Sequence, residues 1–170
     1  MDSIDQDFIK FYQEVGKANG MDELTATLFA RLFIEPDEIA MSELADETGY
    51  SLASISNKIR FLEISGYVVR SKKPGTKKVY LYARKEILDV VIEQISNVRT
   101  NEIKKAKFEI PSMIEYYNSE NLNESQKQKI TILRGYYNDL LKIDDILEDM
   151  VKKIEEIKSS SHLSDVGEGI

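Results

Sequence analysis

Residues 42–82 decide the fold, and they read SELADETGYSLASISNKIRFLEISGYVVRSKKPGTKKVYLY. Ser42 is placed to cap a short helix, and Gly49 stands where that helix would end in the left-handed conformation that glycine adopts at little cost. Ser51 then caps a second, longer helix, which ends at Gly66 in the same way. Two helices in tandem, each with a capping residue and a terminal glycine, predict a helix-turn-helix.

The pattern changes from helix to strand after Gly66. Tyr67–Arg70 and Val79–Tyr82 are short runs rich in β-branched and aromatic residues, which favour strands. Between them, Pro74-Gly75 is a turn dipeptide with lysines on both sides. A helix-turn-helix followed at once by a hairpin with a basic tip predicts a winged helix.

Further helices are expected on both sides of this motif. Residues 5–34 have apolar residues at helical spacing and divide into two helices at Asn19-Gly20. A helical pattern also runs through residues 85–159, where Pro111 is expected to kink or restart the helix. Within that region Asn123 and Gln126 have the spacing of a capping box for the last long helix. Residues 160–170, with two glycines, are expected to fray.

The predicted fold is mainly α-helical with a small β-hairpin wing. Residues 1–84 are expected to form a winged helix-turn-helix DNA-binding domain that includes the N-terminal helices. Residues 85–170 are expected to form a helical dimerisation and effector region. Apolar residues in its last helix recur at steps of three and four, which is typical of a face that packs on another helix. This predicted dimerisation seam consists of Tyr137, Leu140, Ile143, Leu147, Met150, Ile154 and Ile157.

Positive charge is concentrated in one short segment of an acidic chain. The formal net charge is −7, which on average opposes binding to a polyanion. Between Asn57 and Lys85, however, nine Lys and Arg residues stand against one acid, Glu63, so this segment carries +8 and the remainder −15. Such a distribution favours a single basic face that binds nucleic acid. An ordinary solvated basic surface is the alternative.

The second helix of the motif has one apolar side and one polar side, as a helix that enters a major groove requires. Its inner stripe is apolar, with Ile55, Ile59 and Leu62, while its outer face is small and polar with no acid. The outer face consists of Ser51, Ala53, Ser54, Ser56, Asn57 and Arg60, of which Ser54, Asn57 and Arg60 are the first candidates for base contacts. The hairpin is expected to contact phosphates or the minor groove through Lys72, Lys73, Lys77 and Lys78.

Several of these motifs resemble those of a known family. Leu44-Ala45, Thr48–Ser51, Ser54–Ser56, Ile59, Leu62 and Gly66–Val68 resemble the helix-turn-helix signature of MarR-like regulators. Phe11–Lys17 and the wing Lys73–Lys78 are most similar to the GbsR branch, found in bacteria and archaea. The resemblance covers roughly residues 8–90 and implies a dimeric, repressor-like DNA-binding protein. Some relatives regulate genes for osmolyte uptake or synthesis and sense choline. The family's wing usually carries arginine near its tip, where this chain has lysines.

Catalytic and metal chemistry have no residue set in this sequence. The chain has no cysteine, and its one histidine, His162, lies in the expected loose tail. The acidic pairs Asp144-Asp145 and Glu148-Asp149 are interpreted as a solvated helix face. Tyr116-Tyr117 and Tyr136-Tyr137 would suit an aromatic cage for a quaternary ammonium effector, although core and interface positions are favoured for them. No cofactor or metal is expected, and the protein is not expected to be an enzyme.

The leading hypothesis is a cytoplasmic homodimer that binds double-stranded DNA. It would act as a transcriptional regulator, with repression the expected direction, on a near-palindromic operator, and a small-molecule effector of unknown identity would modulate it. No signal peptide and no membrane span are expected. The alternative is a winged-helix module that binds protein and in which the lysines only maintain solubility. An enzymatic function is the third and weakest hypothesis.

Overall fold

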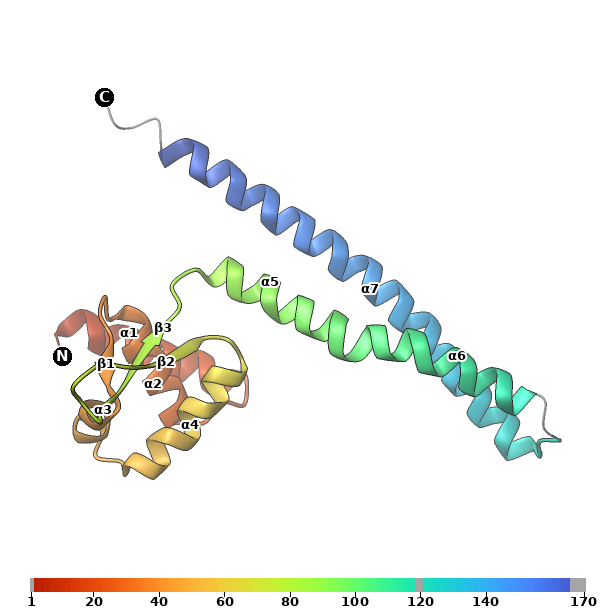
Figure 1. Cartoon of the computed structure of the whole chain (residues 1–170), viewed down its shortest axis with the longest axis horizontal. Coiled ribbons are helices and arrows are strands. Elements are labelled where there is room, and N and C mark those ends of the chain that lie inside the picture. The colour runs from red at the N-terminus through yellow and green to blue at the C-terminus, as the bar shows by residue number, and fades with distance from the viewer. Residues whose placement is uncertain (1, 119–120, 166–170) are drawn as a thin grey trace. The chain divides into compact units, whose positions relative to one another are not determined.

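The computed structural model describes residues 2–118 and 121–165 and is mainly helical (Figure 1). Its elements, in chain order, are α1 (Ser3–Ala18), α2 (Glu23–Ile34), β1 (Ile39–Ala40), α3 (Met41–Thr48), α4 (Leu52–Ile64), β2 (Val68–Lys72), β3 (Val79–Ala83), α5 (Ile87–Val98), the π-helical segment η1 (Arg99–Ile103), α6 (Lys104–Asn118) and α7 (Glu124–Asp165). The chain divides into an N-terminal unit, residues 1–90, and a C-terminal unit, residues 91–170. The predicted fold class, mainly helical with a small β-hairpin wing, is confirmed.

The N-terminal unit is built on a core shared by helices and sheet. Its three strands are antiparallel in the order β1-β3-β2, and Arg70 pairs with Leu81 across the hairpin. The apolar stripe predicted for α4 lies fully in this core. The core consists of Leu24, Leu28, Phe29, Leu32, Ile39, Leu44, Ile55, Ile59, Leu62, Val68, Leu81 and Ala83. Because α4 buries one whole side, its opposite side faces outward.

The caps predicted for the helix-turn-helix are confirmed at three positions. Gly49 ends α3 with a φ of +73°. The Oγ of Ser51 accepts a hydrogen bond from the backbone N–H of Ser54 at 3.2 Å, which fixes the start of α4. Gly66 has a φ of +76°, and the N–H of Tyr67 donates to the carbonyl of Leu62 at 3.0 Å. This pattern closes the end of α4 as a Schellman motif and directs the chain into β2.

The start of α3 differs from the prediction. The helix begins at Met41 with Ala40 as its N-cap, which makes no side-chain capping bond, so Ser42 lies inside the first turn. The reason is the short strand β1, which the sequence did not reveal: Ala40 pairs with Tyr80 of β3. This pairing holds Ala40 in the extended conformation that an N-cap residue needs.

Aromatic rings join α1 to the rest of the N-terminal unit. The ring of Tyr12 on α1 lies 4.8 Å from that of Phe29 on α2, centroid to centroid, and Phe29 lies 5.2 Å from Tyr67. Gly16 lets the two helices approach, because a Cβ at this position would lie 2.9 Å from the Cβ of Ala26. The split predicted at Asn19-Gly20 is confirmed.

The C-terminal unit is a helical hairpin in which α6 and η1 pack along α7. The predicted capping box is confirmed, since the N–H of Asn123 donates to Gln126 at 2.9 Å and the N–H of Gln126 donates to Asn123 at 3.0 Å. Pro111 lies inside α6 and does not restart it. The irregular segment is instead η1, which the sequence did not reveal. Helix α7 is assigned as far as Asp165. Residues 166–170 lie outside the described part, and the fraying expected from residue 160 onward stays a prediction.

Two interpretations of polar and aromatic residues in this unit need correction. Tyr116, Tyr117 and Tyr136 are exposed, so they are not core side chains, and Tyr137 is half-buried. The rings of Tyr116 and Tyr117 meet edge to face, with centroids 5.1 Å apart. Asp144, interpreted as part of a solvated face, is only 8% exposed. The side chain of His162 lies outside the described residues.

Asp144 is the centre of an ion-pair network that joins the three elements of the hairpin. Arg99 Nε donates to Asp144 Oδ1 at 2.6 Å, and Lys107 Nζ donates to Oδ2 at 2.5 Å. Arg99 also donates to Glu148 at 3.0 Å. The sequence showed only adjacent acids, because their cationic partners lie 37 and 45 residues away along the chain.

This network predicts a specific dependence of stability on pH. Hydrogen bonds from Arg99 and then Lys107 hold the pKa of Asp144 below its ordinary value. A carboxyl group with a lowered folded-state pKa stabilises the fold above its unfolded pKa, and this contribution is lost as the pH falls through the folded pKa. We expect Asp144→Asn to lower the Tm at pH 7 and to flatten the decline of the Tm as the pH falls below about 5. Circular dichroism melts of both proteins test this, and parallel Tm profiles would contradict it.

Candidate nucleic-acid interface

The outer face of α4 presents polar side chains at the surface of the N-terminal unit. Asn57 and Arg60 are exposed, and within the described residues neither makes a side-chain hydrogen bond or an ion pair. Ser51 and Ala53 are also exposed. They lie opposite Ile55 and Ile59, which are completely buried. This face is therefore held rigidly by the core while its side chains remain available for contacts.

The two remaining serines of α4 are less available. Ser54 and Ser56 are half-buried. The hydroxyl of Ser54 lies 3.1 Å from that of Ser51, so the two hydroxyls form part of the cap of α4. Among the residues predicted for base contacts, Asn57 and Arg60 are consequently the most accessible.

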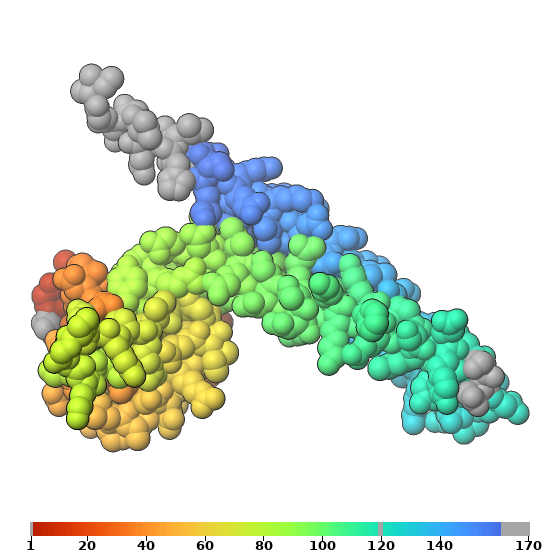
Figure 2. All heavy atoms as spheres, in the orientation of Figure 1, coloured from red at the N-terminus to blue at the C-terminus, as the bar shows by residue number. Residues whose placement is uncertain are grey.

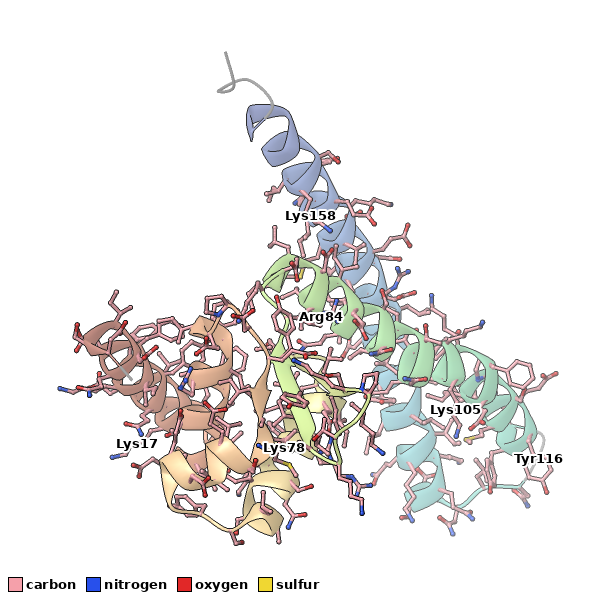
Figure 3. The ribbon with its side chains drawn as sticks, turned by 60° about the vertical axis from the view of Figure 1, so that its left-hand side comes forward. Lys17, Lys78, Arg84, Lys105, Tyr116 and Lys158 are labelled. Carbon is pink, nitrogen blue, oxygen red and sulfur yellow. The ribbon has the colours of Figure 1, made fainter. Side chains whose placement is uncertain are left out.

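The hairpin of β2 and β3 forms a basic wing. Lys72, Lys77 and Lys78 are exposed and make no ion pair with any described residue. Gly75, with a φ of +79°, turns the chain at the tip. The hairpin, coloured yellow-green, lies at the surface of the N-terminal unit in Figure 2, and Lys78 is labelled in Figure 3. Together with Arg60, these three lysines form a set of four cations without ion pairs, which we call the open cations.

Other cations of the basic segment are engaged within the fold. Lys73 pairs with Glu38 at 3.1 Å, and its ammonium also lies 4.3 Å from the centre of the Tyr80 ring. Arg70 binds both carboxylate oxygens of Glu63 at 2.9 Å, which ties the first wing strand to the end of α4. The charge of +8 counted along the sequence therefore overstates the positive charge that this surface presents.

Two further lysines serve the fold. Lys58 pairs with Asp22 at 3.0 Å. The ammonium of Lys85 donates to the backbone carbonyls of Leu32 at 2.8 Å and Glu35 at 2.7 Å, and also to that of Phe33. Lys85 thus caps the C-terminus of α2, and burial lowers its pKa.

Glu38 contacts the wing, which the sequence did not reveal. Hydrogen bonds from Ser71 and Lys73 hold its pKa below the ordinary value, so it is ionised at neutral pH. It reaches the wing from the turn before β1, across 33 residues of chain, and no local pattern indicates this contact. Glu38 thus places a negative charge against the wing, beside Lys73.

The predicted dimerisation seam on α7 divides into two sets. Ile154 is buried, while Tyr137, Leu140 and Leu147 are half-buried. Ile143, Met150 and Ile157 are exposed. Packing within one chain thus covers part of the seam and leaves the second set uncovered.

Two kinds of feature are absent from the described residues. No helix among them is both long and apolar enough to cross a membrane. In the same part of the chain, no three His, Cys, Asp or Glu side chains are grouped so that they could hold a metal ion.

Comparison with known proteins finds similarity at the level of the fold. No family model matches the chain, and no curated protein matches it. A solved structure described as the crystal structure of a transcriptional regulator superimposes with a TM-score of 0.64 at 16% identity. The match covers 89% of this chain and 98% of that chain. The chain accordingly has a winged helix-turn-helix fold with a helical extension, a fold that it shares with that regulator.

Proposed function

We propose that this protein is a sequence-specific regulator of transcription that binds double-stranded DNA as a homodimer. The observation that carries the proposal is the set of open cations, Arg60, Lys72, Lys77 and Lys78, beside the exposed Asn57 of α4. A helix of this type enters the major groove, where Asn can pair with adenine and Arg with guanine or a phosphate. The wing lysines bind phosphates and fix the orientation of α4. The name of the solved structure that shares this fold agrees with such a function.

The homodimer is supported by the uncovered side of α7. Ile143 is 45% exposed and Met150 47% exposed, and Ile146 and Ile157 continue the same stripe at helical spacing. A row of large apolar side chains in water favours association with a second apolar surface. A second copy of α7 supplies such a surface. A twofold dimer would present two copies of α4 about one turn of DNA apart, roughly 34 Å, as a near-palindromic operator requires.

The finer assignments rest on the sequence motifs. We propose membership of the GbsR branch of the MarR-like family, action as a repressor in the cytoplasm, and a response to a small-molecule effector. These proposals follow from the resemblance of the helix-turn-helix and wing motifs. The activity proposed for the chain is binding, not catalysis.

Exposed apolar residues near α4 favour a second function, the binding of a protein partner. Phe61 is 54% exposed and Ile64 75% exposed at the end of α4, and Val69 on β2 is also exposed. A protein-binding module would use these residues and would not need Asn57 or Arg60. Substitution of the two sets therefore separates the two functions.

The proposed function is tested by titrating DNA fragments from around the protein's own gene at several salt concentrations. We expect micromolar or tighter binding, and we expect log K to fall linearly with log[salt]. The variant Lys72→Gln/Lys77→Gln/Lys78→Gln should reduce the slope by about 0.9 for each phosphate that the wing no longer neutralises. Lys10→Gln/Lys17→Gln, which changes exposed lysines of α1, is the control and should leave the slope unchanged. An affinity that does not change with salt concentration, or no binding at micromolar protein, would reject the proposal.

Glu38 is expected to weaken DNA binding. Glu38→Gln releases Lys73 from its carboxylate partner and removes one negative charge from the wing. We expect this variant to bind DNA several-fold more tightly at low salt. The slope of log K against log[salt] should be steeper by about 0.9 per wing, because Lys73 becomes free to contact a DNA phosphate. Glu14→Gln, an exposed acid of α1, serves as the control. Unchanged affinity and slope for Glu38→Gln would show that Lys73 lies away from DNA.

A further inference from the structure

The C-terminal unit contains a basic hollow that the proposed function does not use. Its volume is about 340 Å³. Side chains from α5, η1, α6 and α7 line it, and these are Ser96, Arg99, Thr100, Lys104, Lys107 and Asp144. All of them belong to the same unit. Three cations and two hydroxyl groups thus face one hollow that holds a single carboxylate.

The π-helical segment η1 contributes to this arrangement. Segments of this kind widen one turn of a helix and occur frequently at functional sites. Here the widened turn spans Arg99–Ile103, directly between Ser96 and Lys104. Ile103 is buried, whereas Thr100 and Lys104 are exposed and line the hollow. The segment therefore places polar residues at the hollow while still supplying an apolar residue to the core.

The charges around the hollow are not balanced. Arg99, Lys104 and Lys107 against Asp144 give the lining a net charge of +2, which Glu148, paired with Arg99 at 3.0 Å, reduces to +1. By contrast, residues 91–170 as a whole contain eleven Lys and Arg against fifteen Asp and Glu. Asp144 holds Arg99 at 2.6 Å and Lys107 at 2.5 Å. Lys104 makes no ion pair with any residue that the structure describes. A bound anion would supply Lys104 with the counter-charge that it lacks among the described residues.

We propose that this hollow binds a small soluble molecule through its phosphate group. A phosphate has the opposite charge to the lining, and its oxygens can accept hydrogen bonds from the guanidinium, the two ammonium groups and both hydroxyls. A carboxylate ligand has only two oxygens to accept these hydrogen bonds. One carboxylate, that of Asp144, already lies between Arg99 and Lys107. The volume accommodates a phosphate together with a short carbon skeleton. Asp144 acts as a positioning residue, because it fixes the two cations that it contacts.

Calorimetric titration of the full-length protein with inorganic phosphate, and separately with acetate at equal ionic strength, tests the site. We expect phosphate to bind and acetate to bind at least ten-fold more weakly. Lys104→Gln should weaken phosphate binding by ten-fold or more. Thr100→Val, which removes one hydroxyl and no charge, should weaken it several-fold. The matched control is Lys105→Gln, because Lys105 on α6, labelled in Figure 3, is 69% exposed and is not among the residues that line the hollow. It should bind phosphate like the wild type.

Several results would overturn this inference. Equal losses in Lys104→Gln and Lys105→Gln would show that only general surface charge attracts the anion. Acetate that binds as tightly as phosphate, or no binding of phosphate at millimolar concentration, would exclude a phosphate site. Lys104→Gln could also bind phosphate like the wild type while its DNA affinity depends less steeply on salt. That result would show that Lys104 contacts a DNA phosphate instead. Because the calorimetry contains no DNA, its failure is distinguishable from failure of the proposed regulator function.

Discussion

Replacing Asn57 and Arg60 together by alanine is expected to abolish sequence-specific DNA binding without unfolding the protein. Both side chains are exposed, and neither has a hydrogen-bonding partner among the described residues. The opposite side of α4, with Ile55 and Ile59, remains in the core. Each well-formed interaction between a side chain and a base contributes about 1–3 kcal/mol of discrimination, so removing both should cost about 2–6 kcal/mol at each half-site. Fluorescence anisotropy with operator DNA and with random DNA measures the change in affinity.

The affinity for random DNA distinguishes a loss of sequence reading from a general loss of positive charge. We expect affinity for random DNA to fall much less, because the wing lysines remain. Lys17→Ala/Asn97→Ala removes one cation and one amide from exposed positions elsewhere and serves as the control. If Asn57→Ala/Arg60→Ala binds the operator as the wild type does, α4 is not the reading surface. If Phe61→Ser/Ile64→Ser instead abolishes capture of a protein partner, the interaction module is the better description.

The second large effect is expected from a charge on the uncovered stripe of α7. Ile143→Glu places a carboxylate where two chains would meet, and an unpaired charge in an apolar interface costs several kcal/mol. A single chain tolerates the change, because Ile143 is 45% exposed there. We expect sedimentation to show a monomer. Affinity for the full operator should fall by at least about 100-fold, since the two recognition helices are no longer linked.

A matched charge on the same helix controls for this experiment. Asn138 is exposed on α7, and its position on the helix places it away from both the uncovered stripe and the packed side. Asn138→Glu should therefore leave the dimer and its DNA affinity intact. A wild-type protein that sediments as a monomer, or a dimer that survives Ile143→Glu, would contradict the role proposed for this stripe.

The local elements of the helix-turn-helix were predictable because their causes lie close together in the sequence. Ser51 caps α4 through a residue three positions away, and Gly66 ends α4 through bonds within its last turn. Asn123 and Gln126 behave in the same way at the start of α7. Such interactions depend on spacing alone, so the residue types indicate them directly.

Features that depend on distant contacts were not predictable. The strand β1 has only two residues and exists because β3 pairs with it. The partner of Lys73 is Glu38, and the partners of Asp144 lie on η1 and α6. A count of charges along the chain cannot show which cations a distant carboxylate binds. For this reason the sequence indicated the basic wing but overstated its available charge.

The α7 helix shows a similar limit. Apolar residues at steps of three and four predict a packing face, but they do not distinguish packing within one chain from packing between chains. In the structure Ile154 is buried within the chain, whereas Met150 is exposed. Only the packing of the folded chain separates these two sets.

Helix α4 is proposed to lie in the DNA major groove, twice per assembly. Since the sequence contains no cysteine, Ala53→Cys provides a single attachment site for an iron chelate that cleaves DNA nearby. Ala53 is small, exposed and on the same side of α4 as Asn57. We expect cleavage of operator DNA at two sites separated by about one helical turn, roughly 10 base pairs, with no localised cleavage from Glu14→Cys on α1. Dispersed cleavage from Ala53→Cys, or cleavage indistinguishable from that control, would contradict the claim.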